Sequence, residues 1–132
     1  MTEKRAIDVA TKTGGGFLGT WITATDLGRV WCISAFSKSA KPPVLYLVHA
    51  ETEHILFGTE NSDAASVDGV AVENGAAKLP AIELIGGIRV LVKGLSAWPP
   101  DAVGRRLVAT GSIKLAEKTL ELTQTAYHLR RR

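Results

Sequence analysis

Short runs of alternating or β-branched residues, separated by turn signals every several positions, make up most of this chain. Such runs are typical of β-strands, and no long segment keeps the periodicity of an amphipathic helix. The pattern therefore predicts an all-β protein, a small barrel or sandwich built from hairpins with at most one short helical turn. The predicted strands are residues 20–25, 29–36, 44–50, 54–58, 67–72, 80–84, 89–94, 106–115 and 119–129.

The segment before the first of these strands has a weaker pattern. Residues 1–13 are polar, and a short strand is predicted over residues 6–10. The three glycines at 14–16 provide a hinge, a bulge or a close backbone approach. They are not followed by the Gly-Lys-Ser/Thr that opens the helix of a phosphate-binding loop, so we expect a flexible connector here.

At 132 residues the chain is long enough for one hydrophobic core. We therefore expect a single all-β domain over residues 1–132. The polar connector around residues 60–66 is the best candidate boundary. It would divide the chain into N-terminal hairpins, residues 1–62, and a C-terminal half, residues 66–132.

The C-terminal half contains the pieces GVAVENGAAKLPAIEL, IRVLVKGLSAWPPDAVG and RRLVATGSI. With these pieces, residues 68–113 resemble a small OB-like β-barrel family of uncharacterised bacterial proteins. The resemblance implies that Gly104 ends the connector before the strand RRLVATG, and that Gly111 kinks this strand for barrel closure. It also implies a closing strand over residues 120–129. It implies no catalytic residues, because that family has none to carry over.

The charge of the chain gives little further information about its function. The formal net charge is +3, and it comes from the three arginines at positions 130–132, since the rest of the chain has equal numbers of basic and acidic residues. We expect this tail to be a solubilising terminus, with a phosphate contact as the alternative. A balanced body does not favour nucleic-acid binding, which usually needs a basic face.

The single cysteine and the N-terminus bear on the cellular compartment. Cys32 lies in the apolar run VWCIS, where a buried, inert thiol is expected, with a nucleophile as the alternative. No secretory signal and no run of about 20 apolar residues is present. These features predict a cytoplasmic protein with no membrane partner.

The tryptophans offer candidate contact residues. Trp98 precedes Pro99 and Pro100, and this corner is either a plug in the end of a barrel or an exposed anchor for a partner. Together with the corner, Arg105 and Arg106 are candidates for partner binding.

Two further tryptophans lie in the first predicted hairpin. Trp21 and Trp31 fall in its facing strands, where they would form either a cross-strand pair or a stacking platform.

Two histidines are the only candidates for a metal site. His49 and His54 flank a predicted turn that contains Glu51, and two imidazoles with a carboxylate could bind a metal. The spacing matches no common ligand motif, so we expect solvated hairpin residues, no metal and no cofactor.

The basic residues of the C-terminal half suggest a second function. Single-stranded nucleic acids bind to basic grooves with exposed aromatic rings. Arg89, Lys93, Lys114 and Tyr127 are the candidates for such a site, and ordinary solvated strand faces are the alternative.

No catalytic constellation is present, so we expect no enzyme. The chain is interpreted as a protein-interaction module, an adaptor or an immunity-like blocker acting through its β surface. Its partner would be a protein, with a homodimer as one form. The alternatives are OB-type binding of single-stranded nucleic acid, and binding of a small ligand or metal between the two halves.

Overall fold

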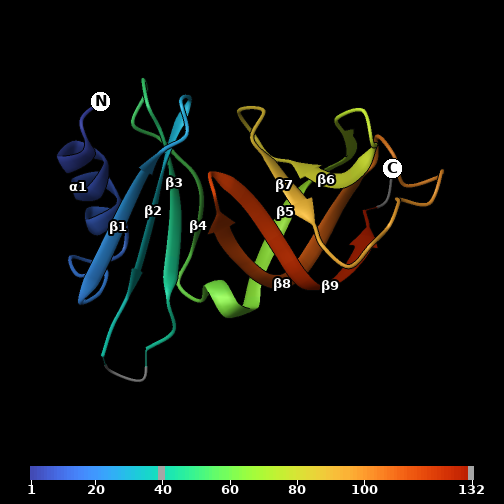
Figure 1. The fold of residues 1–132 in the computed structure, drawn as a ribbon. Helices are drawn as coiled ribbons and strands as arrows, with labels where there is room; N and C mark the ends of the chain where they lie inside the picture. Colours follow the sequence, from blue (N-terminus) through green and yellow to red (C-terminus); the bar gives the residue numbers. More distant parts are fainter. Residues whose placement is uncertain (39–40, 131–132) are drawn as a thin grey trace. The chain divides into compact units, whose positions relative to one another are not determined.

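The computed structural model describes residues 1–38 and 41–130, except for the side chain of Gln124. The chain divides into two compact units, Met1–Asp63 and Ala64–Arg132. Strands predominate in both units, so the predicted all-β class is confirmed (Figure 1). Arg131 and Arg132 of the predicted basic tail lie outside the described residues. No helix in the described part of the chain is long and apolar enough to cross a lipid bilayer.

The first unit is a four-stranded antiparallel sheet with one helix on it. The sheet order is β1-β2-β3-β4, which is also the chain order. The strands are β1 (Trp21–Asp26), β2 (Val30–Phe36), β3 (Val44–His49) and β4 (Ile55–Thr59). Each agrees with a predicted strand to within two residues, because tight polar turns separate the apolar runs.

Helix α1 (Glu3–Thr13) packs on the face that β1, β2 and β3 present to it (Figure 1). Ala6 and Ala10 are fully buried in a cluster with Ile33, Tyr46 and other residues of the sheet. The predicted strand over residues 6–10 is therefore wrong.

The termini of α1 explain why a helix forms there. The Thr2 side chain accepts a hydrogen bond from the backbone N–H of Arg5 at 3.2 Å and so caps the N-terminus. Gly14 follows the last turn, and its N–H donates to the carbonyl of Ala10. Two features favour a helix over the predicted strand. The segment has a capping residue at each end, and its small apolar side chains at positions 6 and 10 lie four residues apart on one helix face.

An exposed ion pair ties α1 to the turn between β3 and β4. The Arg5 guanidinium donates to both carboxylate oxygens of Glu53, at 2.6 and 2.9 Å. This hydrogen bond, followed by the charge of Arg5, lowers the pKa of Glu53 from its usual 4.5. Both side chains are exposed to solvent, so salt screens the interaction.

We predict that this pair gives the first unit a small pH dependence of stability. A carboxylate with a lowered folded pKa stabilises the fold above its unfolded pKa, and the contribution is lost as pH falls through the folded value. The difference in free energy of unfolding between wild type and Glu53→Gln should therefore be largest above pH 4.5 and should shrink below it. Urea denaturation at several pH values measures it. An unchanged difference at pH 3 would contradict the prediction.

The second unit is a closed five-stranded barrel, in agreement with the predicted all-β barrel class. The short 3₁₀ helix η1 (Ser62–Ala64) leads into it. Around the barrel the order is β5-β6-β7-β9-β8, with β5 paired to both β6 and β8. The pair β7–β9 is parallel and the others are antiparallel. The strands are β5 (Ala65–Asn74), β6 (Leu79–Glu83), β7 (Arg89–Val92), β8 (Arg106–Ala116) and β9 (Thr119–Leu129).

Two of the predicted glycine roles agree with the barrel. The register between β8 and β9 shifts between Thr110 and Ser112, so Gly111 lies at a β-bulge, where the strand bends. Gly104 has φ +83° and ends the connector before β8. In this connector, residues 99–105 form consecutive hydrogen-bonded turns.

Trp98 is buried within the barrel unit, where it closes the β5–β6 ladder. Its indole N–H donates to the carbonyls of Val72 and Ala81, at 3.0 and 3.1 Å, and these two residues are paired across β5 and β6. Its ring meets the edge of Tyr127 at a centroid distance of 5.1 Å. Of the two alternatives for the Trp-Pro-Pro corner, this geometry favours the plug.

Candidate functional site

The first unit exposes a pair of aromatic rings at the edge of its sheet. Trp21 of β1 and Phe36 of β2 are opposite each other in the register, and their rings stack at 4.8 Å. They are 44% and 53% exposed, which is unusual for rings of this size. The Lys38 ammonium lies 5.4 Å from the centre of the Trp21 ring, a cation–π contact. We call Trp21, Phe36 and Lys38 the aromatic edge.

The strand that carries Trp21 is an edge strand without the usual protection. In the described part of the chain β1 pairs only with β2, and all six of its residues are in register. Its sequence, WITATD, contains no proline or lysine, and its ladder has no bulge. Edge strands of natural proteins usually carry one of these features to prevent pairing with other chains. The other edge strand, β4, has a register shift and Gly58.

The register also corrects one expectation about the tryptophans. Trp31 pairs with Asp26 at the turn end of the hairpin, while Trp21 pairs with Phe36 at the far end. The cross-strand pair of Trp21 with Trp31 is therefore wrong. Trp31 instead packs partly buried against the core under α1.

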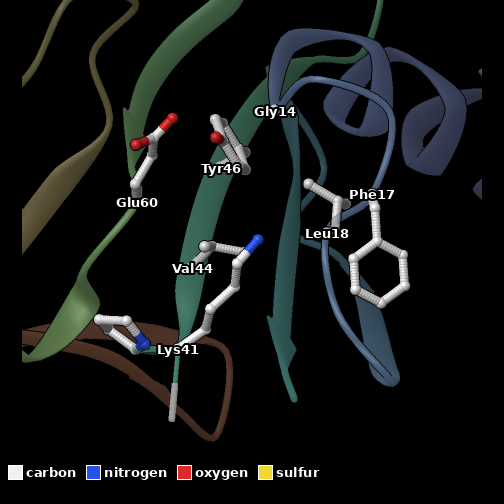
Figure 2. A pocket seen from close by; sticks show the side chains of 8 residues that line it. Gly14, Phe17, Leu18, Lys41, Val44, Tyr46 and Glu60 are labelled. Atoms are coloured by element: carbon white, nitrogen blue, oxygen red, sulfur yellow. The ribbon is translucent and has the colours of Figure 1, made fainter. Parts of the chain in front are cut away.

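A pocket of about 210 Å³ opens beside β3 in the same unit (Figure 2). We call it the Tyr46 pocket. Its walls combine apolar side chains with one cation, one anion and one hydroxyl. It is lined by Gly14, Phe17, Leu18, Lys41, Pro42, Val44, Tyr46 and Glu60.

Tyr46 forms the floor of this pocket and is only 4% exposed. Its ring covers Gly58 on β4 so closely that a Cβ there would lie 2.6 Å from a ring carbon. A Cβ on Gly14 would come within 2.7 Å of a Leu18 methyl and 3.3 Å of the Tyr46 hydroxyl. Gly58 is therefore required for the ring to reach its place, whereas at Gly14 an added Cβ would mainly displace the Leu18 methyl. The short distances around Gly14 agree with a close backbone approach, one of the alternatives for residues 14–16.

The Tyr46 hydroxyl remains a proton donor over a wide pH range. Burial, and secondly the negative charge of Glu60, raises its pKa. Among the described residues no hydrogen bond to this hydroxyl is found, and the hydroxyl is not one of the buried polar atoms without a partner, so it is open to the pocket. Figure 2 shows that Lys41 and Glu60, from different segments, line the same pocket.

The histidine cluster has a structural role. Nδ1 of His49 accepts hydrogen bonds from the backbone N–H groups of Glu51 and Thr52, both at 3.2 Å, and so closes the β3–β4 turn. His54 is exposed on the other side of that turn. Among the residues described, no group of three His, Cys, Asp or Glu side chains is close enough to hold a metal ion.

Most basic candidates of the barrel are engaged by acidic or carbonyl groups. Arg89 contacts Glu83 at 3.3 Å and the side chain of Asn74 at 3.2 Å. Arg106 and Arg130 both contact Asp68, at 3.3 and 2.7 Å.

A second group of candidates lies along β7 and β9. Lys93 and Tyr127 line a shared groove of about 290 Å³, but the Lys93 ammonium lies 3.6 Å from the Glu121 carboxylate. Lys114 is exposed and is the register partner of Glu121.

The remaining candidates surround the Trp-Pro-Pro corner. Pro99 and Pro100 are exposed. Arg105 donates to the backbone carbonyl of Arg130 at 2.9 Å, and its buried Nε has no partner among the described residues. These groups therefore do not converge on one feature with the buried Trp98 ring.

Cys32 is buried on β2, as predicted. Burial raises the pKa of its thiol to about 12, so the thiolate needed for nucleophilic attack is nearly absent at neutral pH. This environment agrees with an inert thiol.

Sequence reasoning missed both features described above. The stack of Trp21 on Phe36 could have been predicted, because the turn at residues 27–29 fixes which residues of the hairpin are opposite one another. The Tyr46 pocket was not, because its side chains come from segments that only the folded sheet brings together. No protein-family model, no curated protein and no solved structure matches this chain.

Proposed function

We propose that this chain is a protein-interaction module that pairs an extended segment of a partner protein with the free edge of β1. The observation that carries the proposal is an unprotected edge strand with an exposed aromatic pair at one end. Strand addition supplies backbone hydrogen bonds along the edge, and neighbouring side chains supply specificity.

The aromatic edge has the composition of a binding hot spot. Trp and Phe are enriched in the cores of protein interfaces, and Trp is among the residues whose truncation costs most. Stacking holds the rings of Trp21 and Phe36 in place before a partner arrives, so less side-chain entropy is lost on binding. Ile22, which is 40% exposed on the opposite face of β1, adds apolar surface on the same strand.

Charge near the aromatic edge suggests the chemistry of the partner. Lys38 lies above Trp21. We therefore expect a segment with an apolar residue to contact Trp21 and an acidic residue near Lys38. A second copy of the chain is one protein that could present such a strand.

The test is affinity capture from cells that contain the protein, with and without nuclease, followed by titration of the captured protein. Trp21→Ala should weaken the complex by about 2 kcal/mol or more, about 30-fold, because truncation of a Trp that acts as a binding hot spot usually costs this much. Ile85→Ala is the matched control, since Ile85 is a 72% exposed apolar residue of the barrel. Light scattering during gel filtration would reveal self-association.

Two results would overturn the proposal. In one, the partner binds wild type and Trp21→Ala equally well. In the other, capture depends on nucleic acid and falls steeply with salt, which would favour the alternative of single-stranded nucleic-acid binding. That alternative draws support from the groove shared by Lys93 and Tyr127. The ion pairs of Arg89, Lys93 and Arg106 with carboxylates weaken it.

A further inference from the structure

We propose that the Tyr46 pocket binds a free α-amino acid with an apolar side chain. The inference is independent of the proposed partner strand, because the pocket does not include Trp21, Phe36 or Lys38. Three observations carry it: a hydroxyl that faces the pocket, two opposite charges at one pocket, and an apolar wall.

The hydroxyl of Tyr46 provides the first observation. The side chain is 96% buried. Its hydroxyl is open to the pocket, and no hydrogen bond to it is found in the described part of the chain. A ligand that carries an acceptor group would receive a hydrogen bond from this hydroxyl in place of water. The raised pKa keeps this group protonated, so the ligand atom that meets it is an acceptor.

Two opposite charges provide the second observation. Lys41 and Glu60 line the same pocket, yet in the described part of the chain they form no ion pair within 4.0 Å. A ligand with only a carboxylate would be repelled by Glu60, and a ligand with only an ammonium group would be repelled by Lys41. A zwitterion satisfies both, with its carboxylate at Lys41 and the Tyr46 hydroxyl and its ammonium at Glu60.

The apolar walls and the size of the pocket provide the third observation. Phe17, Leu18 and Val44 offer apolar surface to a ligand side chain. The volume of about 210 Å³ lies below the range of about 300–1,000 Å³ that drug-sized ligands occupy. A single amino acid carries both charges on one carbon and fits this size, whereas a peptide separates its terminal charges by at least one further residue.

The test is calorimetric titration of the full chain with L-leucine. Two analogues are run in parallel, 4-methylpentanoate, which lacks the ammonium group, and 3-methylbutylamine, which lacks the carboxylate. Leucine should bind saturably with one site per chain. Each analogue should bind at least about tenfold more weakly, because it loses a charge-assisted hydrogen bond and leaves one pocket charge unpaired.

Variants locate the site. Lys41→Ala and Glu60→Gln should each weaken leucine binding about tenfold or more, and Tyr46→Phe about two- to tenfold. Lys4→Ala and Glu51→Gln are the matched controls, because they remove the same charges from exposed positions outside the pocket, and they should leave binding unchanged. Circular dichroism confirms that each variant is folded.

The outcomes are distinct. Absence of saturable heat up to the solubility limit of leucine would overturn the proposal, as would equal binding of the analogues. Unchanged binding by Lys41→Ala and Glu60→Gln would place any leucine elsewhere on the chain and also overturn it. Equal binding of leucyl-leucine would overturn the assignment to a free amino acid. Trp21→Ala should still bind leucine, so this proposal and the proposed partner strand can fail separately.

Discussion

Replacing Trp98 by alanine should lower the free energy of unfolding of the barrel by about 3–5 kcal/mol, the cost typical of removing a buried Trp side chain. The change empties the space that the indole fills beside Tyr127. It also removes the donor that the carbonyls of Val72 and Ala81 share across β5 and β6. Urea denaturation measures the loss, and hydrogen exchange of peptides from each unit shows where it occurs.

Two further variants separate the contributions. Trp98→Phe keeps most of the ring but loses both hydrogen bonds, so it should cost about 1–3 kcal/mol. Trp21→Ala is the matched control for an exposed Trp, and it should cost about 1 kcal/mol or less, the value of an aromatic pair at a surface. A Trp98→Ala protein as stable as Trp21→Ala would contradict the plug.

Replacing Gly69 by alanine should destabilise the barrel by about 3 kcal/mol, at the upper end of the cost of overpacking. A Cβ at this position would lie 2.5 Å from the backbone oxygen of Glu83 and 2.7 Å from a methyl of Ile82. The oxygen belongs to the β5–β6 ladder, so it cannot move aside without opening the pair of strands. Thermal and urea denaturation measure the change.

Gly94→Ala is the control for the same chemical change. Gly94 has φ +87° and nothing within 4 Å of an added Cβ, so its cost is conformational strain alone, about 1–2 kcal/mol. Equal destabilisation by the two variants would show that the barrel relaxes around Gly69. Strand residues that pass another backbone this closely are usually glycine for this reason.

The strands could be predicted from the sequence because each is a short apolar run between turn residues. The predicted run over residues 119–129 has the observed bounds of β9, and no predicted run lacks a strand in the structure except residues 6–10. That exception had a readable signal, since Thr2 and Gly14 are good helix caps. Only Ala6 and Ala10 are fully buried, however, so the apolar face of this helix is narrow. The segment is therefore helical mainly because it packs on the sheet.

The candidate sites were less predictable because they depend on register and on side-chain direction. Trp98 is conspicuous in the sequence, but only the fold shows that its indole faces inward to Val72 and Ala81. Lys41 and Glu60 are separated by two strands in the chain, and nothing in their local sequence indicates that they line one pocket. In the sequence Tyr46 looks like an ordinary strand residue, and only the fold shows that it lines this pocket.

The position of β9 between β7 and β8 has a consequence for biosynthesis. The ribosome makes β9 last of the five barrel strands, yet it is the strand that joins the two neighbours on either side of it. Until it emerges from the exit tunnel, the nascent barrel has two open borders able to associate with other polypeptides. Chaperone contact with the nascent chain should therefore be strongest just before residues 119–129 are released, and should end when they dock.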